Sequence, residues 1–189
     1  TLFVLLFSSS VVAEDISDFQ IDGMSVGDSL LDYFSEEKIL NGEVTIYPNS
    51  NKFFDINLLA KEYNKNSNYY SYSFSVKKDD NEYRIYNLRG IKFYENEISK
   101  CFEFKKSLIN DLNIFSENIK REDYEFNYDK LADGKSMSYV TNYLFKSGNI
   151  RIYCNEWSKK TKKQFNQMDA FAFEIIMQEH LDWVSNKAY

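Results

Sequence analysis

His180 is the only histidine in the chain, and it is the first residue to consider for chemistry because histidine can activate a serine or cysteine nucleophile. It falls at the edge of the apolar stripe of a predicted terminal helix, in the segment Glu179-His180-Leu181-Asp182-Trp183. No G-x-S-x-G motif accompanies it, although paired carboxylates hydrolyse glycosides without any fixed spacing in sequence. We predict no catalytic residue and no enzymatic activity. The alternative is a small exported hydrolase that uses carboxylates or His180.

The sequence also lacks metal-ligand and cofactor motifs. One histidine and two cysteines do not supply a transition-metal ligand set. Two acidic groups, Asp79-Asp80-Glu82 and Asp129 with Asp133, do not follow the spacing of a calcium loop. No phosphate-binding or dinucleotide-binding glycine motif occurs among the six glycines. We therefore expect neither a metal nor a cofactor.

Cys101 and Cys154 are the only cysteines. Cys101 lies near the centre of the apolar stripe of the predicted helix 97–119, where Lys105 has to extend its charged end outward. Cys154 lies on the inner face of a predicted strand, so a helix that covers the sheet would bring the two sulfur atoms together. We predict a structural disulfide, as is usual in an oxidising compartment. Two free buried thiols are the alternative.

The segments 137–145 and 149–157 are predicted to form a hairpin. A two- or four-residue loop around Ser147-Gly148 keeps the apolar residues of both strands on one face, whereas a three-residue loop would not. The expected cross-strand pairs are Phe145 with Ile150 and Tyr143 with Ile152.

The opposite face of this hairpin is the candidate binding face. It combines aromatic rings with amides and a guanidinium group, which suits sugars, peptides or the edge of a partner. The alternative is an outer face that is covered by the chain's own loops or by its terminal helix. The residues of the candidate binding face are Asn142, Arg151, Tyr153, Asn155 and Trp157.

Hydrophobic periodicity predicts a mixture of helices and strands. Ser25 and Asp28 resemble a capping box in front of a helix that would bury Val26, Leu30, Tyr33 and Phe34. A short helical turn is expected after Ser35, ending near Gly42. The other predicted elements are strands at 52–60, 69–77, 82–94, 123–128, 137–145, 149–157 and 167–177, and helices at 97–119 and 178–187.

Consecutive strands joined by short turns favour antiparallel pairing. We predict an α+β fold in which a mostly antiparallel sheet carries the long helix 97–119 on one face, with a possible diverged αβββ repeat.

Charge is distributed unevenly along the chain. The formal net charge is −6, which disfavours nucleic acid as a partner. Residues 14–45 contain nine acidic residues and one basic residue, which we interpret as a solvated helical face, with a docking surface as the alternative. Four lysines in the segment 158–163 (SKKTKK) are expected to lie in a solvated loop that could also touch an anionic surface.

Residues 1–13 (TLFVLLFSSSVVA) have the composition of a secretory signal peptide that lacks its charged beginning. Val11 and Ala13 occupy the small-residue positions of a cleavage site. We expect cleavage there, a single α+β domain over 14–189 with no transmembrane span, and a periplasmic or secreted location. A buried strand or helix of a cytosolic domain is the alternative.

The segment from Phe19 to Ser35 contains the residues GMSVGDSLLDYF. This segment resembles the opening of an uncharacterised family of small exported proteins that is typical of AT-rich marine alphaproteobacteria. The helix around Cys101 and the IYCNEW strand around Cys154 are similar to theirs as well. The family implies no activity. Gly23-Met24-Ser25 before a helix also resembles the G-M-[ST] entry of outer-membrane assembly lipoproteins and β-lactamase-inhibitor-like folds, although the lipid-bearing cysteine is missing.

From these observations we expect a non-catalytic exported protein that binds a small ligand or another envelope protein. A purely structural envelope component is a further alternative.

Overall fold

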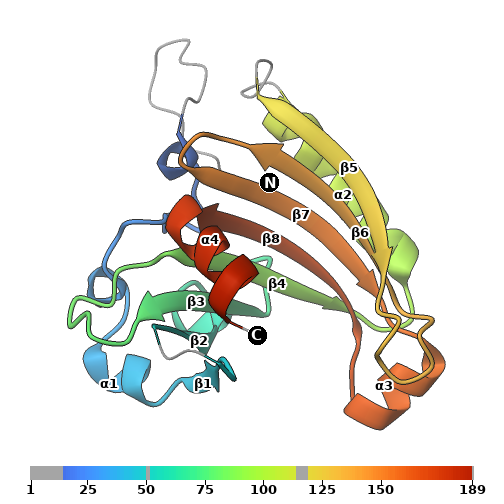
Figure 1. Cartoon of the computed structure of the whole chain (residues 1–189), viewed down its shortest axis with the longest axis horizontal. Helices are drawn as coiled ribbons and strands as arrows, with labels where there is room; N and C mark the ends of the chain where they lie inside the picture. Colours follow the sequence, from blue (N-terminus) through green and yellow to red (C-terminus); the bar gives the residue numbers. More distant parts are fainter. Residues whose placement is uncertain (1–14, 50–51, 114–118, 189) are drawn as a thin grey trace.

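A single antiparallel sheet of eight strands organises the computed structural model, which describes residues 15–49, 52–113 and 119–188 (Figure 1). The strands follow the order β1-β2-β3-β4-β8-β7-β6-β5. Their bounds are β1 Glu43–Ile46, β2 Phe53–Leu59, β3 Ser71–Lys77, β4 Asn87–Tyr94, β5 Lys120–Asn127, β6 Met137–Leu144, β7 Gly148–Glu156 and β8 Asp169–Met177. The helices are α1 Glu36–Leu40, α2 Ile98–Asn113, α3 Lys159–Phe165 and α4 Gln178–Lys187, with short 3₁₀ turns at Ile16–Asp18, Leu30–Asp32 and Ala60–Glu62.

The strand order is symmetrical about the central β4–β8 pair. β1 to β4 form one antiparallel meander and β5 to β8 form a second, and the last strands of the two meanders pair with each other. A helix precedes each meander, α1 the first and α2 the second. The predicted α+β class with an antiparallel sheet is confirmed. Each half has four strands rather than the three expected for an αβββ repeat.

One face of the sheet carries the main hydrophobic core. α2 packs on this face against β4, β7 and β8, and the segment 15–42 packs beside it. Edge-to-face aromatic contacts connect the layers, as between Phe34 and Phe74 and between Phe104 and Phe171, whose ring centroids lie 5.8 and 4.7 Å apart. Burial of these side chains provides most of the driving force for folding.

The opposite face carries α4, which lies in front of β8 in Figure 1. A second, smaller core holds it there, formed by Phe53, Trp183 and Ala188 with Tyr47, Tyr86 and Val184 packed around them. Glu179 at the start of the helix pairs with Lys52 at 2.9 Å and Lys77 at 3.0 Å. No helix among the described residues is both long and apolar enough to cross a membrane.

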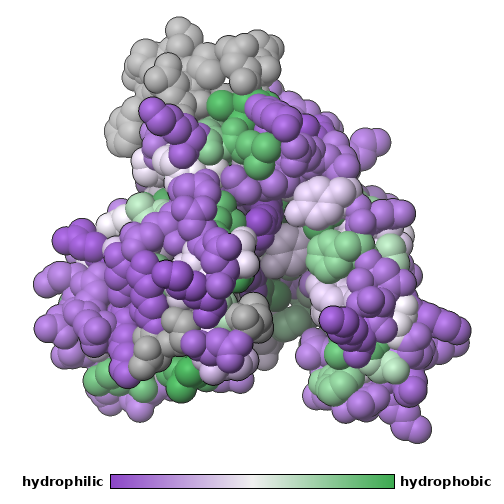
Figure 2. All heavy atoms as spheres, viewed as in Figure 1, coloured by the Kyte–Doolittle hydropathy of each residue, from purple (hydrophilic) through white to green (hydrophobic). Residues whose placement is uncertain are grey.

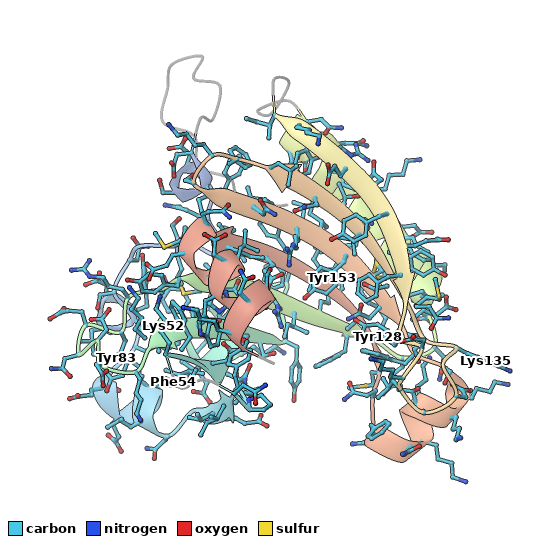
Figure 3. The ribbon with its side chains drawn as sticks, viewed as in Figure 1. Lys52, Phe54, Tyr83, Tyr128, Lys135 and Tyr153 are labelled. Carbon is cyan, nitrogen blue, oxygen red and sulfur yellow. A yellow bond between two sulfur atoms is a disulfide. The ribbon has the colours of Figure 1, made fainter. Side chains whose placement is uncertain are left out.

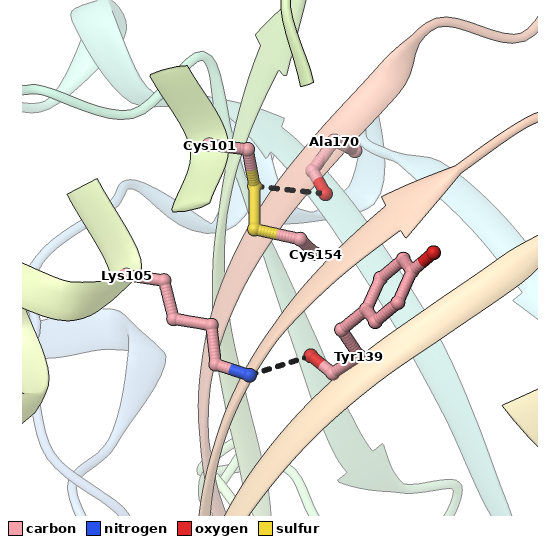
Figure 4. Close-up of a disulfide and its surroundings, with 5 residues drawn as sticks. All are labelled: Cys101, Lys105, Tyr139, Cys154 and Ala170. Carbon is pink, nitrogen blue, oxygen red and sulfur yellow. Dashed lines mark hydrogen bonds between the residues drawn. A yellow bond between two sulfur atoms is a disulfide. The ribbon is translucent and has the colours of Figure 1, made fainter. Parts of the chain in front are cut away.

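The predicted disulfide between Cys101 and Cys154 is confirmed (Figure 4). It joins α2 to β7 across the main core, with a Cα–Cα distance of 6.1 Å and both residues fully buried. One turn further along α2, the ammonium group of Lys105 extends to the sheet and donates a hydrogen bond to the carbonyl oxygen of Tyr139 at 2.7 Å. Burial lowers the pKa of this lysine to about 8.

The predicted helix beginning at Ser25 is wrong, and long-range hydrogen bonding explains why. Gly27 adopts a φ of +91°, and its N–H bonds the carbonyl oxygen of Ile85 at 2.8 Å instead of a carbonyl within a helix. The Asp28 carboxylate does accept the Ser25 N–H at 2.8 Å, so half of the expected capping box forms without a helix behind it. Only the 3₁₀ turn Leu30–Asp32 remains, and it still buries Leu30.

The hairpin between β6 and β7 differs from the predicted register by two residues. The structure pairs Tyr143 with Ile150 and Thr141 with Ile152, and residues 145–148 form a four-residue loop. A shift by an even number of residues leaves every side chain on its predicted face. The division of the hairpin into an inner and an outer face is therefore correct.

The remaining differences are local. The helix α2 ends at Asn113, before the predicted 119, and residues 114–118 lie outside the described part. β4 begins at Asn87 rather than 82, and β1 and the helix α3 were not predicted. The SKKTKK segment forms α3 because the Ser158 side chain caps the N–H of Thr161. The predicted signal peptide, 1–13, also lies outside the described residues.

The acidic segment 14–45 does not form the solvated helical face that we expected. Several of its carboxylates accept hydrogen bonds that hold the segment together. Asp28 accepts from Tyr33 at 2.5 Å, and Asp22 accepts from Tyr72 on β3. These acids have a structural role.

Removing the disulfide should destabilise the fold without changing it. In the chain-entropy model, a cross-link between residues separated by 53 positions contributes about 4 kcal/mol. We expect the Cys101→Ser/Cys154→Ser double variant to lose about that much free energy of unfolding in urea titrations, with an unchanged far-ultraviolet circular dichroism spectrum. The native protein should expose no alkylatable thiol before reduction. Equal stability of the variant and the native protein would contradict this assignment.

Candidate functional site

The face of the sheet that carries α4 contains a cavity of about 360 Å³. Its floor is formed by β4, β8, β7 and β6, and α4 and the end of β5 form its sides. Figure 2 shows this side of the molecule hollowed between two masses of side chains, and Figure 3 places Tyr153 and Tyr128 along the curved inner surface. The volume falls within the range typical of small-molecule sites.

A row of charged residues crosses the floor of this cavity. Glu174 on β8 pairs in register with Arg89 on β4 and with Arg151 on β7. Directly paired residues of antiparallel strands point to the same face, so the carboxylate lies between two guanidinium groups. The row continues into Ser73 on β3 and Asn142 on β6.

Glu174 is the centre of this row and is only 3% exposed. Its Oε1 accepts hydrogen bonds from Nη2 of Arg89 at 2.5 Å, from Nε of Arg89 at 3.0 Å and from Nδ2 of Asn87 at 3.0 Å. Burial alone would raise the pKa of Glu174, but the charges of Arg89 and Arg151 lower it below its ordinary value. The carboxylate is therefore held in its ionised form.

Three buried polar atoms of the cavity have no hydrogen-bond partner within the described chain. They are Oδ1 of Asn87, Nε of Arg151 and Nε2 of His180, and all three residues line the cavity. Asn87 and His180 are each 3% exposed. Buried polar atoms are nearly always paired, so a ligand in the cavity would complete the bonding of these three. Two further buried atoms, Oδ1 of Asn142 and Nε1 of Trp157, are also unpaired among the described residues but lie outside the lining.

His180 reaches the cavity from the first turn of α4. Its ring packs against Phe53 and Trp183, with centroid distances of 5.0 and 5.5 Å. Burial lowers the pKa of His180 to about 4, and the nearby charge of Glu174 only partly opposes this. The imidazole is therefore neutral at physiological pH, and it can donate or accept a hydrogen bond but adds no charge.

Aromatic and aliphatic side chains form the walls of the cavity. Tyr153 pairs with the small residue Ala172 on β8, and its neighbour on the same face, Asn155, pairs with Ala170. These alanines leave room above β8 for the rings. The other apolar and aromatic lining residues are Tyr47, Tyr124, Phe126, Val140, Ile176, Leu181 and Val184.

Three of the five residues of the candidate binding face line the cavity: Arg151, Tyr153 and Asn155. Asn142 lies in the same charged row but outside the cavity lining, and it is 5% exposed. Trp157 stacks against Tyr128, with centroids 4.9 Å apart, and also lies outside the lining. The alternative that the terminal helix covers this face is correct for β7 and β8, since α4 packs there.

Sequence reasoning missed the other half of the floor. Arg89, Glu174 and Asn87 come from β4 and β8, and no local pattern relates side chains that are 85 or more residues apart in sequence. A usable signal was present in each strand. Glu174 interrupts the otherwise apolar run AFAFEIIM, and Arg89 stands between Leu88 and Gly90. A single charge inside a buried strand requires a partner of opposite charge.

Comparison with known proteins gives no match: no family model matches the chain, and neither a curated protein nor a solved structure does so significantly. The resemblance to a family of small exported proteins therefore stays a prediction.

The buried environment of His180 can be measured directly. Because the chain has one histidine, its imidazole NMR signals titrate without overlap from another. We expect a folded-state midpoint near pH 4, compared with 6.5 for an unperturbed histidine. A midpoint above 6 would contradict the burial of the ring.

The same shift affects stability. As pH falls from 6.5 towards 4, His180 becomes protonated in the unfolded chain but stays neutral in the folded chain. The free energy of unfolding therefore decreases across this pH range. The decrease attributable to His180 is about 3 kcal/mol. A His180→Asn variant should lack this component, so its free energy of unfolding should fall less steeply with pH than that of the native protein.

Removing the charge of Glu174 should destabilise the fold strongly. The Glu174→Gln variant leaves the half-buried Arg89 without its carboxylate, which costs about 3 kcal/mol. The matched control is Glu122→Gln, because Glu122 occupies the same cross-strand row on the edge strand β5 and is paired only at the surface, with Lys120. That change should cost less than about 1 kcal/mol. Similar losses in urea titrations of the two variants would contradict a central role for Glu174.

Proposed function

We propose that this protein is an exported, non-catalytic binding protein that holds a small molecule in the cavity between the sheet and α4. The observation that carries the proposal is the set of three unpartnered buried polar atoms, on Asn87, Arg151 and His180, that surround one cavity. Leaving each such atom unpaired costs about 1–3 kcal/mol, and a bound ligand recovers that free energy.

A small molecule suits this site better than a protein surface does. Asn87 and His180 are each 3% exposed, and His180 belongs to α4, which packs on β7 and β8. Only a molecule small enough to enter beneath the helix reaches these atoms. The aromatic and aliphatic walls then cover the rest of such a ligand, as in most small-molecule sites.

An exported location is supported by the disulfide. Structural disulfides form and persist in secreted and periplasmic proteins and are rare in a reducing cytosol. The composition of residues 1–13 as a signal peptide agrees with the same location.

The hydrolase alternative receives no specific support from the cavity. It requires two carboxylates in one cleft or a hydroxyl group beside His180. Among the described residues, Glu174 is the one acid in the cavity lining, and its lowered pKa makes it a poor proton donor. Nε2 of His180 has no hydrogen-bond partner within the described chain.

The test is a thermal-shift screen of a chemically diverse library of small molecules. A ligand at 100 times its dissociation constant stabilises the folded state by about 2.7 kcal/mol, which raises the melting temperature by roughly 5 °C or more. We expect a group of library compounds to raise the melting temperature of the native protein in this way.

A variant that fills the cavity separates specific binding from surface adsorption. Leu181 lines the cavity from α4 and is half-buried, so Leu181→Trp should fill the space and abolish the shifts. The control is Leu40→Trp, at a side chain that is 65% exposed on α1, which should retain them. A native protein that no compound stabilises, or shifts that persist in Leu181→Trp, would contradict the proposal.

A further inference from the structure

The charges that line the cavity do not balance. Arg89 and Arg151 contribute two positive charges, Glu174 contributes one negative charge, and burial keeps His180 neutral. Asp55 lies near Arg89 but outside the lining, where it accepts hydrogen bonds from Ser75 and Tyr47 at 2.5 and 2.9 Å. Hydroxyl groups therefore occupy both carboxylate oxygens of Asp55, and burial raises its pKa. Among the side chains that line the cavity, one positive charge is left over.

This surplus charge belongs to Arg151. Glu174 accepts its hydrogen bonds from Arg89 and Asn87, whereas Arg151 forms no ion pair with any described residue, and its Nε has no partner. An arginine presents Nε–H and Nη–H as a planar fork, which matches the two oxygen atoms of a carboxylate. A doubly charged phosphate fits less well, because the lining holds no lysine and only one uncompensated guanidinium group.

The side walls of the cavity indicate what the uncharged part of the ligand is. Tyr124, Phe126 and Tyr128 line the cavity from the end of β5 and the turn after it, and Leu181 and Val184 line it from α4. Such a slot suits a flat ring, which aromatic side chains contact by stacking or edge-to-face packing. Oδ1 of Asn87 can only accept a hydrogen bond, so a hydroxyl group on the ring would satisfy it.

We infer that the ligand is a small aromatic carboxylic acid, bound with its carboxylate on Arg151 and its ring between α4 and the aromatic residues of the β5 end. This inference rests on the proposed function and specifies the chemical class of the ligand.

The test uses four matched probes in isothermal titration calorimetry at neutral pH: para-hydroxyphenylacetate, its neutral amide, phenylacetate without the hydroxyl group, and hexanoate without the ring. We expect para-hydroxyphenylacetate to bind roughly ten-fold to a hundred-fold more tightly than its amide, since a hydrogen bond to a charged group has that value. Hexanoate should bind more weakly than either aromatic acid. Equal affinity for acid and amide, or tighter binding of hexanoate, would overturn the inference.

Variants assign the preference to Arg151. Arg151→Gln should make the acid and the amide equal in affinity, and Arg151→Lys should keep part of the difference because it retains charge but loses the fork. The control Arg84→Gln removes an exposed arginine outside the cavity and should leave the preference unchanged. A preference that persists in Arg151→Gln would overturn the inference. The probe comparison in the native protein does not depend on the folding of any variant.

The two proposals fail in different ways. If the diverse library yields no ligand, the proposed binding function is wrong. If the library yields ligands that are neutral, cationic or aliphatic and still fail in Leu181→Trp, the binding function stands and the aromatic-acid class is wrong.

Discussion

The ion pair between Glu174 and Arg89 is the interaction on which the cavity depends. A carboxylate that is 3% exposed at the centre of a sheet is tolerated only if a cation and further donors surround it. Arg89 and Asn87 supply them from β4, and Arg151 adds its field from β7. Since these strands belong to different meanders, the charged row also distinguishes the observed β4–β8 register from a shifted one. A slip of one residue would place Glu174 in the hydrophobic core.

The two faces of the sheet differ in what they carry: one holds the main core, and the other holds the cavity to which we assign the proposed binding function. The face under α2 holds the main core and the disulfide, so most of the folding free energy is generated there. The opposite face can then carry a polar row and a cavity, which cost free energy. Similar divisions are common in antiparallel sheets, where one face packs on a core and the other is free for polar residues. Cys154 follows Tyr153 on β7, so the two side chains point to opposite faces of the sheet. The disulfide therefore fixes β7 to α2 on the core face, directly behind Tyr153 in the cavity.

Elements that depend on interactions between residues close in sequence could be predicted, and features that depend on distant residues could not. The strand alternation at Ser71–Lys77, the short helix after Ser35 and the terminal helix were predictable because each depends on local periodicity and capping. The segment after Ser25 was not, because its helical pattern is overridden by hydrogen bonds from Gly27 and Leu30 to residues 85 and 83. The binding face divided in the same way. Its residues on β7 could be predicted, because an even-numbered hairpin loop decides which side chains share a face. Arg89 and Glu174 could not be predicted, because their proximity depends on a pairing between β4 and β8 that no local pattern encodes.

The proposed binding function depends on the unpaired polar atoms of the cavity. Outside the cavity lining, the same face of β8 presents Ala170 and Ala172, which have no polar side-chain atoms to satisfy. A chain under selection for stability alone would gain by extending that pattern, because replacing a buried polar network with apolar residues is often neutral or stabilising. Instead, Asn87, Arg151 and His180 converge from β4, β7 and α4 on one space and leave three polar atoms without a partner there. Three separate elements that each bear this cost at the same point are better explained by a shared ligand than by three independent packing defects.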